Sequence, residues 1–366
     1  MSPRERLLSV LEGKQPDRVP WFGDLDYWAN SLVKRGLKPE DFIASDDYIS
    51  WHRDLGVGFY LQGYFPFRHI TDNCKTREWN EGYRRFKEIE TPFGTVRECW
   101  EYMPSSFCEA PVEHFMKSEE DIPSLKFIYE NSRFEPDYDL ADIRKQQVGD
   151  QGFVLCYLPK SPFMHLLALE AGVMAVTMIA LNAPDEFRGL LDAMDRAFDM
   201  AAQIAVESPA EVLMIPENLS SEMVGPDFFE LYMRDYQMKW TDRIRAAGKY
   251  SFIHIDGTLT GLLRQEASVG FNVLEALTPY PVGDIRFEEL SDFIGDSKSI
   301  IWGGIPGSYF TNCVSDIEFD RHVKYVLSVM TKKPRYVLGV ADQVPPDGLE
   351  RRVKRVSHLI EKFGRY

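Results

Sequence analysis

Eight short apolar runs, separated by longer stretches of helical character, constrain the fold of this chain more than any other feature. Most of the runs are closed by Gly, Pro or Asp, at their last residue or the next one, and all are rich in Val, Ile, Phe or Tyr, a pattern typical of buried parallel strands. From residue 153 onward they alternate with helical stretches, which predicts right-handed βαβ units. Eight such strands predict an α/β fold that closes into a (βα)8 TIM barrel. The runs are Val19–Gly23, Val57–Gln62, Phe153–Leu158, Val212–Asn218, Tyr250–Gly257, Phe271–Leu277, Ser299–Pro306 and Tyr336–Asp342.

Helix start signals fit the same alternation. Ser2-Pro3-Arg4-Glu5 is a capping box with proline at the first helical position, which predicts an N-terminal helix. Three further helices are expected: a long amphipathic one from Pro184, one from Pro226 to about Ala247, and one from Ser315 to Met330.

Residues 63–152 are too long for a simple crossover between the second and third strands. Within them, Tyr83–Thr91 and Thr95–Met103 are β-prone and flank Pro92-Phe93-Gly94, which predicts a β-hairpin. We therefore expect residues 1–366 to form a single barrel domain whose insertion, 63–152, decorates one end.

Charge and composition exclude several classes of function. The chain has 57 acidic against 42 basic residues and a formal net charge of −15, which disfavours nucleic acid as a partner. No run of 18 apolar residues predicts a membrane span, and the segment from Met1 to Arg6 is too charged to begin a signal peptide, so a cytoplasmic location is expected. The five cysteines are scattered without CxxC spacing, so no disulfide framework or thiolate metal site is indicated.

In a barrel of this kind the chemistry lies at the carboxyl ends of the strands. His254 and Asp256 are two residues apart at one strand end, so their side chains share a side. Glu217, Glu275 and Asp342 end three other predicted strands. Closure of the barrel would bring Asp342 near the aromatic and acidic stretch 21–28.

Each of these residues also has a purely structural interpretation. His254 could be bonded to backbone, and Asp256 could close a strand in an Asp-Gly turn. Asp342 could cap a helix, and Glu217 could satisfy loop backbone. The aromatic residues near the first two strands could belong to the core rather than to a pocket.

Several motifs, taken in order, resemble the uroporphyrinogen decarboxylase superfamily, and more closely its corrinoid-linked methyltransferase branch than the decarboxylase. The resemblance spans most of the chain and implies a (βα)8 barrel, in agreement with the strand count. The matching segments are Arg4–Gly13, Asp17-Arg18-Val19-Pro20, Glu90–Thr95, Lys117–Asp121, His254-Ile255-Asp256-Gly257, Pro281-Val282-Gly283-Asp284, Gly303-Gly304-Ile305-Pro306 and Asp342–Asp347.

The resemblance implies a metal site. Zinc-dependent methyltransferases of that branch hold zinc with a His-x-Cys-Gly pair and a second Cys before a C-terminal Pro-rich turn. Here His254 matches the histidine, while Asp256 and Asp342 stand where the two cysteines would be. The expected zinc set is therefore His254, Asp256 and Asp342, with Glu217 as a fourth ligand or a base. Zinc is the expected metal, although a carboxylate set suits other divalent ions too.

The decarboxylase uses arginines after the first strand to bind its polyanionic substrate, whereas this chain has two aspartates and no arginine in residues 21–28. An aromatic mouth with a few acids instead suits a methoxylated aromatic ring. The expected substrate-binding residues are Trp21, Asp24, Trp28, Tyr60, Tyr64 and Glu275.

The predicted function is metal-assisted transfer of a methyl group between a small donor, such as an aryl methyl ether, and a corrinoid. His254, Asp256 and Glu217 are the expected catalytic residues. The chain has no Asp-x-His-x-x-Gly cobalamin signature, so a separate partner protein must carry the corrinoid. Transfer to a thiol acceptor, a metal-free decarboxylase and a non-catalytic ligand-binding barrel remain alternatives, as does a homodimer.

Overall fold

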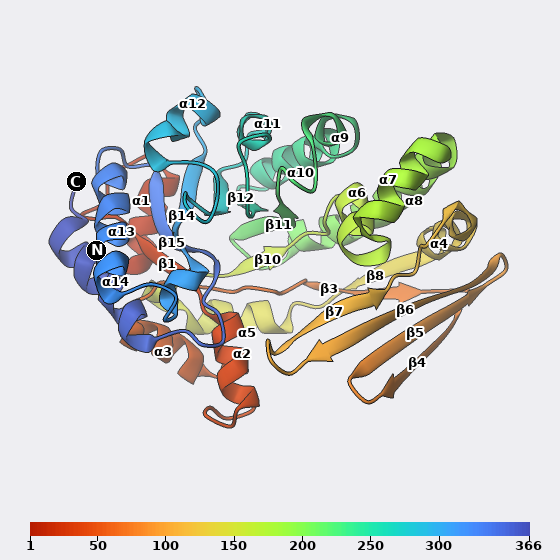
Figure 1. The fold of residues 1–366 in the computed structure, drawn as a ribbon, viewed down its shortest axis with the longest axis horizontal. Helices are drawn as coiled ribbons and strands as arrows, with labels where there is room; N and C mark the ends of the chain where they lie inside the picture. Colours follow the sequence, from red (N-terminus) through yellow and green to blue (C-terminus); the bar gives the residue numbers. More distant parts are fainter.

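The computed structural model describes residues 1–366 and is built around a curled sheet of seven strands, with every pairing parallel (Figure 1). The two chain termini lie on the same side of the sheet, close to helices α1, α13 and α14 (Figure 1). In sheet order the strands are β1 (Trp21–Asp24), β15 (Tyr336–Gln343), β14 (Ile300–Pro306), β13 (Val273–Leu277), β12 (Tyr250–Ile255), β11 (Val212–Leu219) and β10 (Leu155–Tyr157).

The second predicted strand joins this sheet only through short links. Strand β2 (Phe59–Tyr60) pairs in parallel with β9 (Gly152–Phe153), and a single bridge connects Phe22 of β1 to Gly58. Val154 alone separates β9 from β10. A side chain at Gly152 would have its Cβ 1.6 Å from the carbonyl oxygen of Phe59, so this close approach requires glycine. Each predicted strand therefore has a counterpart, although the regular sheet has seven strands and not the expected eight.

Helices follow most of the strands and cover the outside of the sheet. The N-terminal helix α1 begins with the predicted capping box, as does α13 after Ser315. The helix expected from Pro226 to Ala247 is interrupted at Met233, where φ and ψ are −121° and −39°. The helices are α1 (Pro3–Leu11), α2 (Asp26–Lys34), α3 (Asp46–Leu55), α6 (Pro162–His165), α7 (Gly172–Asn182), α8 (Pro184–Glu207), α9 (Pro226–Tyr232), α10 (Arg234–Ala246), α11 (Leu263–Val269), α12 (Leu290–Ile294), α13 (Asp316–Met330) and α14 (Glu350–Phe363).

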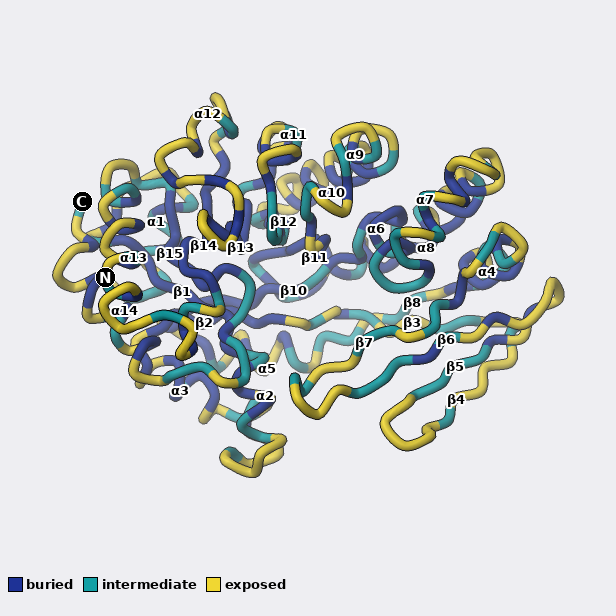
Figure 2. The backbone as a smooth tube through the Cα atoms, viewed as in Figure 1, coloured by how far each residue is buried: buried dark blue, intermediate teal, exposed yellow.

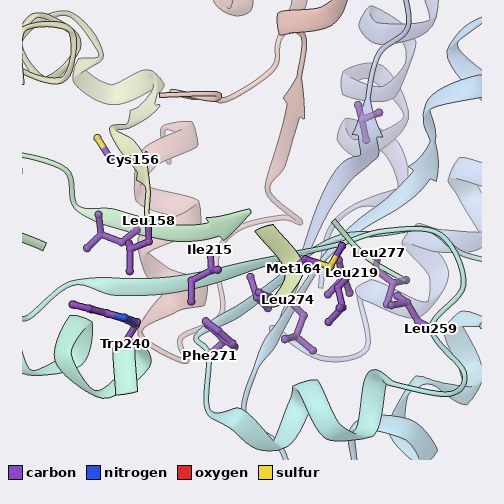
Figure 3. Packing of buried hydrophobic residues seen from close by; sticks show 14 of the residues in the cluster. Cys156, Leu158, Met164, Ile215, Leu219, Trp240, Leu259, Phe271, Leu274 and Leu277 are labelled. Atoms are coloured by element: carbon purple, nitrogen blue, oxygen red, sulfur yellow. The ribbon is translucent and has the colours of Figure 1, made fainter. Parts of the chain in front are cut away.

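Two apolar layers hold the strands in place, because both faces of the sheet are buried. The outer layer, between sheet and helices, contains Ile215, Trp240 and Leu274 (Figure 3). The inner layer is a separate cluster of 13 buried residues, which includes Phe22, Tyr60, Met214, Phe252, Val273, Trp302 and Val337. Because side chains alternate along a strand, membership of the inner layer shows which residues point inward.

The segment between β2 and β9 forms its own antiparallel layers beside the sheet (Figure 1). The two strands of the expected hairpin pair as β5 and β6, but they are the centre of a four-stranded sheet, not an isolated hairpin. This sheet is mostly exposed or half-buried, whereas the strands of the parallel sheet are buried (Figure 2). The elements of the segment are β3 (Phe67–Thr71), β4 (Lys75–Glu81), β5 (Arg84–Thr91), β6 (Gly94–Met103), β7 (Cys108–Glu113), α4 (Ile122–Glu130), β8 (Ser132–Pro136) and α5 (Asp139–Gln147).

No helix in the chain combines the length and apolar character that crossing a bilayer would require.

Candidate functional site

A layer of polar side chains lies directly above the inner apolar layer, at the carboxyl ends of the strands. Phe252 and Val273 belong to the inner layer, so His254 and Glu275, two residues further along each strand, also point inward. The same alternation places Asp24 inward two residues after Phe22. The polar groups of three strands therefore converge at one end of the sheet.

The closest contact in this layer joins His254 and Glu275, which face each other across β12 and β13. Nδ1 of His254 lies 2.6 Å from Oε2 of Glu275, and the Glu275 side chain is only 1% exposed. Burial by itself lowers the pKa of His254. The carboxylate of Glu275, together with those of Asp342 and Asp256, outweighs that effect, so the net pKa of His254 is raised. The imidazole is therefore held ready to carry a proton, with its Nε2 atom free of Glu275.

Asp342 approaches that free nitrogen from β15. Its Oδ1 atom lies 3.8 Å from Nε2 of His254, and its side chain is half-exposed at the rim of the site. Burial and the neighbouring acids raise the pKa of Asp342, although His254 acts against them. The backbone of Asp342 has φ 67°, a left-handed conformation that non-glycine residues adopt rarely and that is common at functional sites. Asn218 on β11 and Ala276 on β13 have φ values of 54° and 69°.

Tyr60 and Asp24 complete the layer. The Tyr60 hydroxyl donates to Oε1 of Glu275 at 3.3 Å, so Glu275 bridges a phenol and an imidazole. Asp24 is 5% exposed, and burial together with the nearby Asp26 raises its pKa well above the usual range. Burial thus favours the uncharged form of the Asp24 carboxyl group, which reduces the repulsion among the acids here.

Two of the expected catalytic and metal-binding residues make their hydrogen bonds outside this cluster. Oδ1 of Asp256 accepts from the backbone N–H of Gly257 at 2.7 Å, which is the Asp-Gly turn that the sequence left open as an alternative. Glu217 is fully buried on the opposite face of β11, where its carboxylate accepts from the backbone N–H of Ser161 at 3.1 and 3.2 Å. It lies 3.5 Å from Nε2 of Gln237 on α10. Glu217 therefore anchors a helix to the sheet.

The predicted metal set is consequently not assembled as expected. Of the three carboxylates in the set, only that of Asp342 lies within 4 Å of the His254 ring nitrogens. Asp256 is still near enough to raise the pKa of both His254 and Asp342. Nowhere in the chain do three His, Cys, Asp or Glu side chains come together in the geometry of a metal site. The arrangement on His254 does resemble metal centres in one respect, because a carboxylate holds the imidazole by one nitrogen and leaves the other free.

The expected aromatic mouth is also largely absent from the site. Trp21 precedes the inward-facing Phe22, so it points outward and stacks on Phe310 with ring centroids 6.3 Å apart. Trp28 is 4% exposed on α2 and packs on Trp51 of α3 at 4.8 Å. Both tryptophans pack in the core of this structure, away from the polar layer. The Tyr64 hydroxyl donates to the carbonyl of Asp137, outside the polar layer.

One residue of the site received no role from the sequence. Tyr157 of β10 donates to Oε1 of Gln62 at 2.5 Å and has a pKa raised by burial and by Asp24. Both residues end predicted strands, and their position was the only available signal. Glu275 was expected to contact substrate, and its pairing with His254 depends on strand register, which the sequence does not specify.

Comparisons with known proteins agree with this architecture. The family model described as "Uroporphyrinogen decarboxylase (URO-D)" matches residues 108–363. Among solved structures, a methyltransferase from Methanosarcina mazei superposes with a TM-score of 0.64 over 99% of both chains at 15% identity, which shows a shared fold. A GH27 β-L-arabinopyranosidase from Geobacillus stearothermophilus covers 93% of this chain and 77% of its own at 12% identity, but its TM-score of 0.35 is too low to support an inference. A search of curated proteins finds no match. Because the family model covers most of the chain, the protein belongs to the uroporphyrinogen decarboxylase family.

Proposed function

We propose that this protein is a methyltransferase that moves a methyl group between a small donor, of the aryl methyl ether class, and a corrinoid held by a partner protein. The observation that carries the proposal is the connected set Tyr60–Glu275–His254–Asp342 at the carboxyl end of the sheet. The fold shared with a Methanosarcina mazei methyltransferase supports it.

A side chain of the site can supply the proton that the ether oxygen takes up when it loses its methyl group. When the O–CH3 bond breaks, its electron pair stays on oxygen and the methyl group passes to the acceptor. Nε2 of His254 can donate a proton to that oxygen, because its pKa is raised and its Nδ1 is held by Glu275. Glu275 keeps the ring oriented and stabilises its positive charge, while Tyr60 holds the second oxygen of Glu275. The corrinoid, when present, supplies the nucleophile that takes the methyl group.

Metal assistance is a separate part of the proposal. Nε2 of His254 and the carboxylate of Asp342 are the two protein donors available to a divalent ion, and Glu275 would orient the histidine from behind. Bound zinc would act as a Lewis acid toward the ether oxygen. Catalytic zinc sites use three protein donors, so the residues present fit such a site only in part.

Decarboxylation is the second candidate, because the matched family model carries the decarboxylase name. The charges of the site disfavour it for a polycarboxylate substrate. The side chains that converge here include Asp24, Glu275 and Asp342. Where the decarboxylase has arginines after its first strand, this chain has Asp24 and Asp26.

Incubation with reduced cobalamin and a panel of methoxybenzoates tests the proposal, with free cobalamin standing in for the protein-held corrinoid. We expect enzyme-dependent formation of methylcobalamin, followed by its absorbance, together with the demethylated phenol. Uroporphyrinogen supplied in parallel should remain unchanged. Turnover of uroporphyrinogen without any methylcobalamin would contradict the proposal and favour the decarboxylase.

A further inference from the structure

A second cavity lies between the inserted segment and the helices, away from the His254 site. Its volume is about 310 Å³, within the range of sites for small organic ligands. None of its lining residues is His254, Glu275, Tyr60 or Asp342. It is bounded by β3 and β8 on one side and by α4 and α8 on the other, which pack against one another. The proposed methyl transfer makes no use of this cavity.

Six of the 17 residues that line the cavity are Phe or Tyr. Phe67 and Phe134 meet edge to face at 5.6 Å, and Phe198 of α8 packs edge to face on Tyr129 at 5.6 Å. Phe65, which is 41% exposed, lies at the side nearest the parallel sheet and contacts Tyr157. Such walls favour a flat apolar ligand, which can stack or pack edge to face on several rings.

The polar part of the lining is centred on Glu170. Its Oε1 atom accepts from the Tyr129 hydroxyl at 2.6 Å and lies 3.5 Å from Nε2 of His165. Its Oε2 atom is buried and has no hydrogen-bond partner. An unpaired buried carboxylate oxygen is costly, and a ligand with a hydrogen-bond donor would remove that cost. Burial acts to raise the pKa of Glu170, but His165 and Tyr129 together lower it by more. The net pKa is therefore below the usual value, and the group is charged at neutral pH.

The backbone and the neighbouring cations refine the choice of ligand. Glu170 ends a π-helix over Leu166–Glu170, a rare conformation that is frequent at functional sites. Lys87 and Lys160 also line the cavity, and their positive charges disfavour an ammonium group next to them. A neutral hydroxyl therefore suits the unpaired oxygen better than an amine does.

We propose that this cavity binds a flat aromatic alcohol whose hydroxyl donates to Oε2 of Glu170 and whose ring lies among Phe67, Phe134 and Phe198. The site goes beyond methyl transfer and does not depend on it.

Titration calorimetry with 2-naphthol as the probe tests this site on the full chain. We expect saturable one-to-one binding that weakens at least tenfold in Glu170→Gln. We expect the same loss for naphthalene, which keeps the rings and lacks the donor. Glu135→Gln is the matched control, because it makes the same charge change on the exposed side of β8 and should bind as the wild type does.

If Glu170→Gln does not fold, Thr71→Trp provides an independent test, since it fills the cavity from β3 and should abolish binding. The proposal is overturned if 2-naphthol does not saturate the wild type. It is equally overturned if the folded pocket variants bind 2-naphthol as tightly as the wild type does, or if the wild type binds naphthalene as tightly as 2-naphthol.

Discussion

Nδ1 of His254 and Oε2 of Glu275 lie 2.6 Å apart on directly opposed positions of adjacent strands. This pair turns a strand-end histidine into an oriented acid with a raised pKa. It also leaves Nε2 as the only ring nitrogen that faces Asp342 and the open end of the sheet.

Replacing Glu275 by Gln should lower the pKa of His254, because the carboxylate is the strongest influence raising it. A general acid works only while protonated, so the alkaline limb of the pH–rate profile should move to lower pH. We expect methyl transfer to fall of the order of 10-fold to 100-fold, less than when the acid itself is removed. The measurement is the pH dependence of methylcobalamin formation, with the exposed Glu289→Gln as control. An unmoved alkaline limb would refute this role for Glu275.

Asp256→Asn should leave methyl transfer within about threefold of the wild type, because its carboxylate bonds the Gly257 backbone. Any bound zinc should fall in His254→Ala and in Asp342→Asn but not in Asp256→Asn. Metal analysis of the three purified variants, prepared without chelator, checks this pattern. Loss of metal in Asp256→Asn would mean that Asp256 is a metal ligand, as the sequence predicted.

Trp28→Leu should destabilise the protein, since Trp28 is buried against Trp51. A loss of about 2–4 kcal/mol is expected for so large a change in a core. The affinity of the folded protein for a methoxybenzoate should not change. Thermal denaturation and titration of the same samples separate the two effects, and Trp79→Leu on the half-buried face of β4 should cost less. A variant with normal stability and lost ligand binding would place Trp28 in the pocket after all.

Glu266→Gln should stabilise the protein at neutral and alkaline pH. Burial raises the pKa of Glu266 to about 8, against 4.5 in the unfolded chain, and its main contact is Nε2 of Gln237 at 3.0 Å. A carboxyl with a raised folded pKa binds more protons in the folded state, so it destabilises the fold progressively as pH rises from about 4.5 to 8. Removing it should add of the order of 2–4 kcal/mol at pH 7.

Melting temperatures of Glu266→Gln and wild type at pH 5, 7 and 9 test that difference. The gap should widen from pH 5 to pH 9, whereas the exposed Glu222→Gln should follow the wild type throughout. A constant gap would mean that Glu266 is charged in the folded protein at all three values.

The sequence predicted the strands well because each is a short apolar run with a terminator, and this pattern is local. The meeting of His254 and Asp342 was also predictable, since the carboxyl ends of parallel strands share one edge. The sequence did not predict the face of the sheet to which individual side chains point. Strands buried on both faces have no polar–apolar alternation, so nothing in the sequence showed that Trp21 and Glu217 face the helices.

The inserted segment shows a similar limit. The hairpin around Pro92-Phe93-Gly94 carries a local turn signal, but the outer strands β4 and β7 are exposed or half-buried along their length and lack an apolar pattern. The cavity at Glu170 depends on contacts among β3, α4 and α8, which are distant in sequence. No local motif marks such a site.

The role of His254 as the general acid is decided by the rate of methylcobalamin formation in His254→Gln, compared with wild type and with His322→Gln. His322 bonds the backbone of Gly304 from α13 and serves as a matched histidine outside the site. We expect a loss of about 10²–10⁴-fold in folded His254→Gln, with His322→Gln close to wild type. Methyl transfer at the wild-type rate in folded His254→Gln would contradict that role.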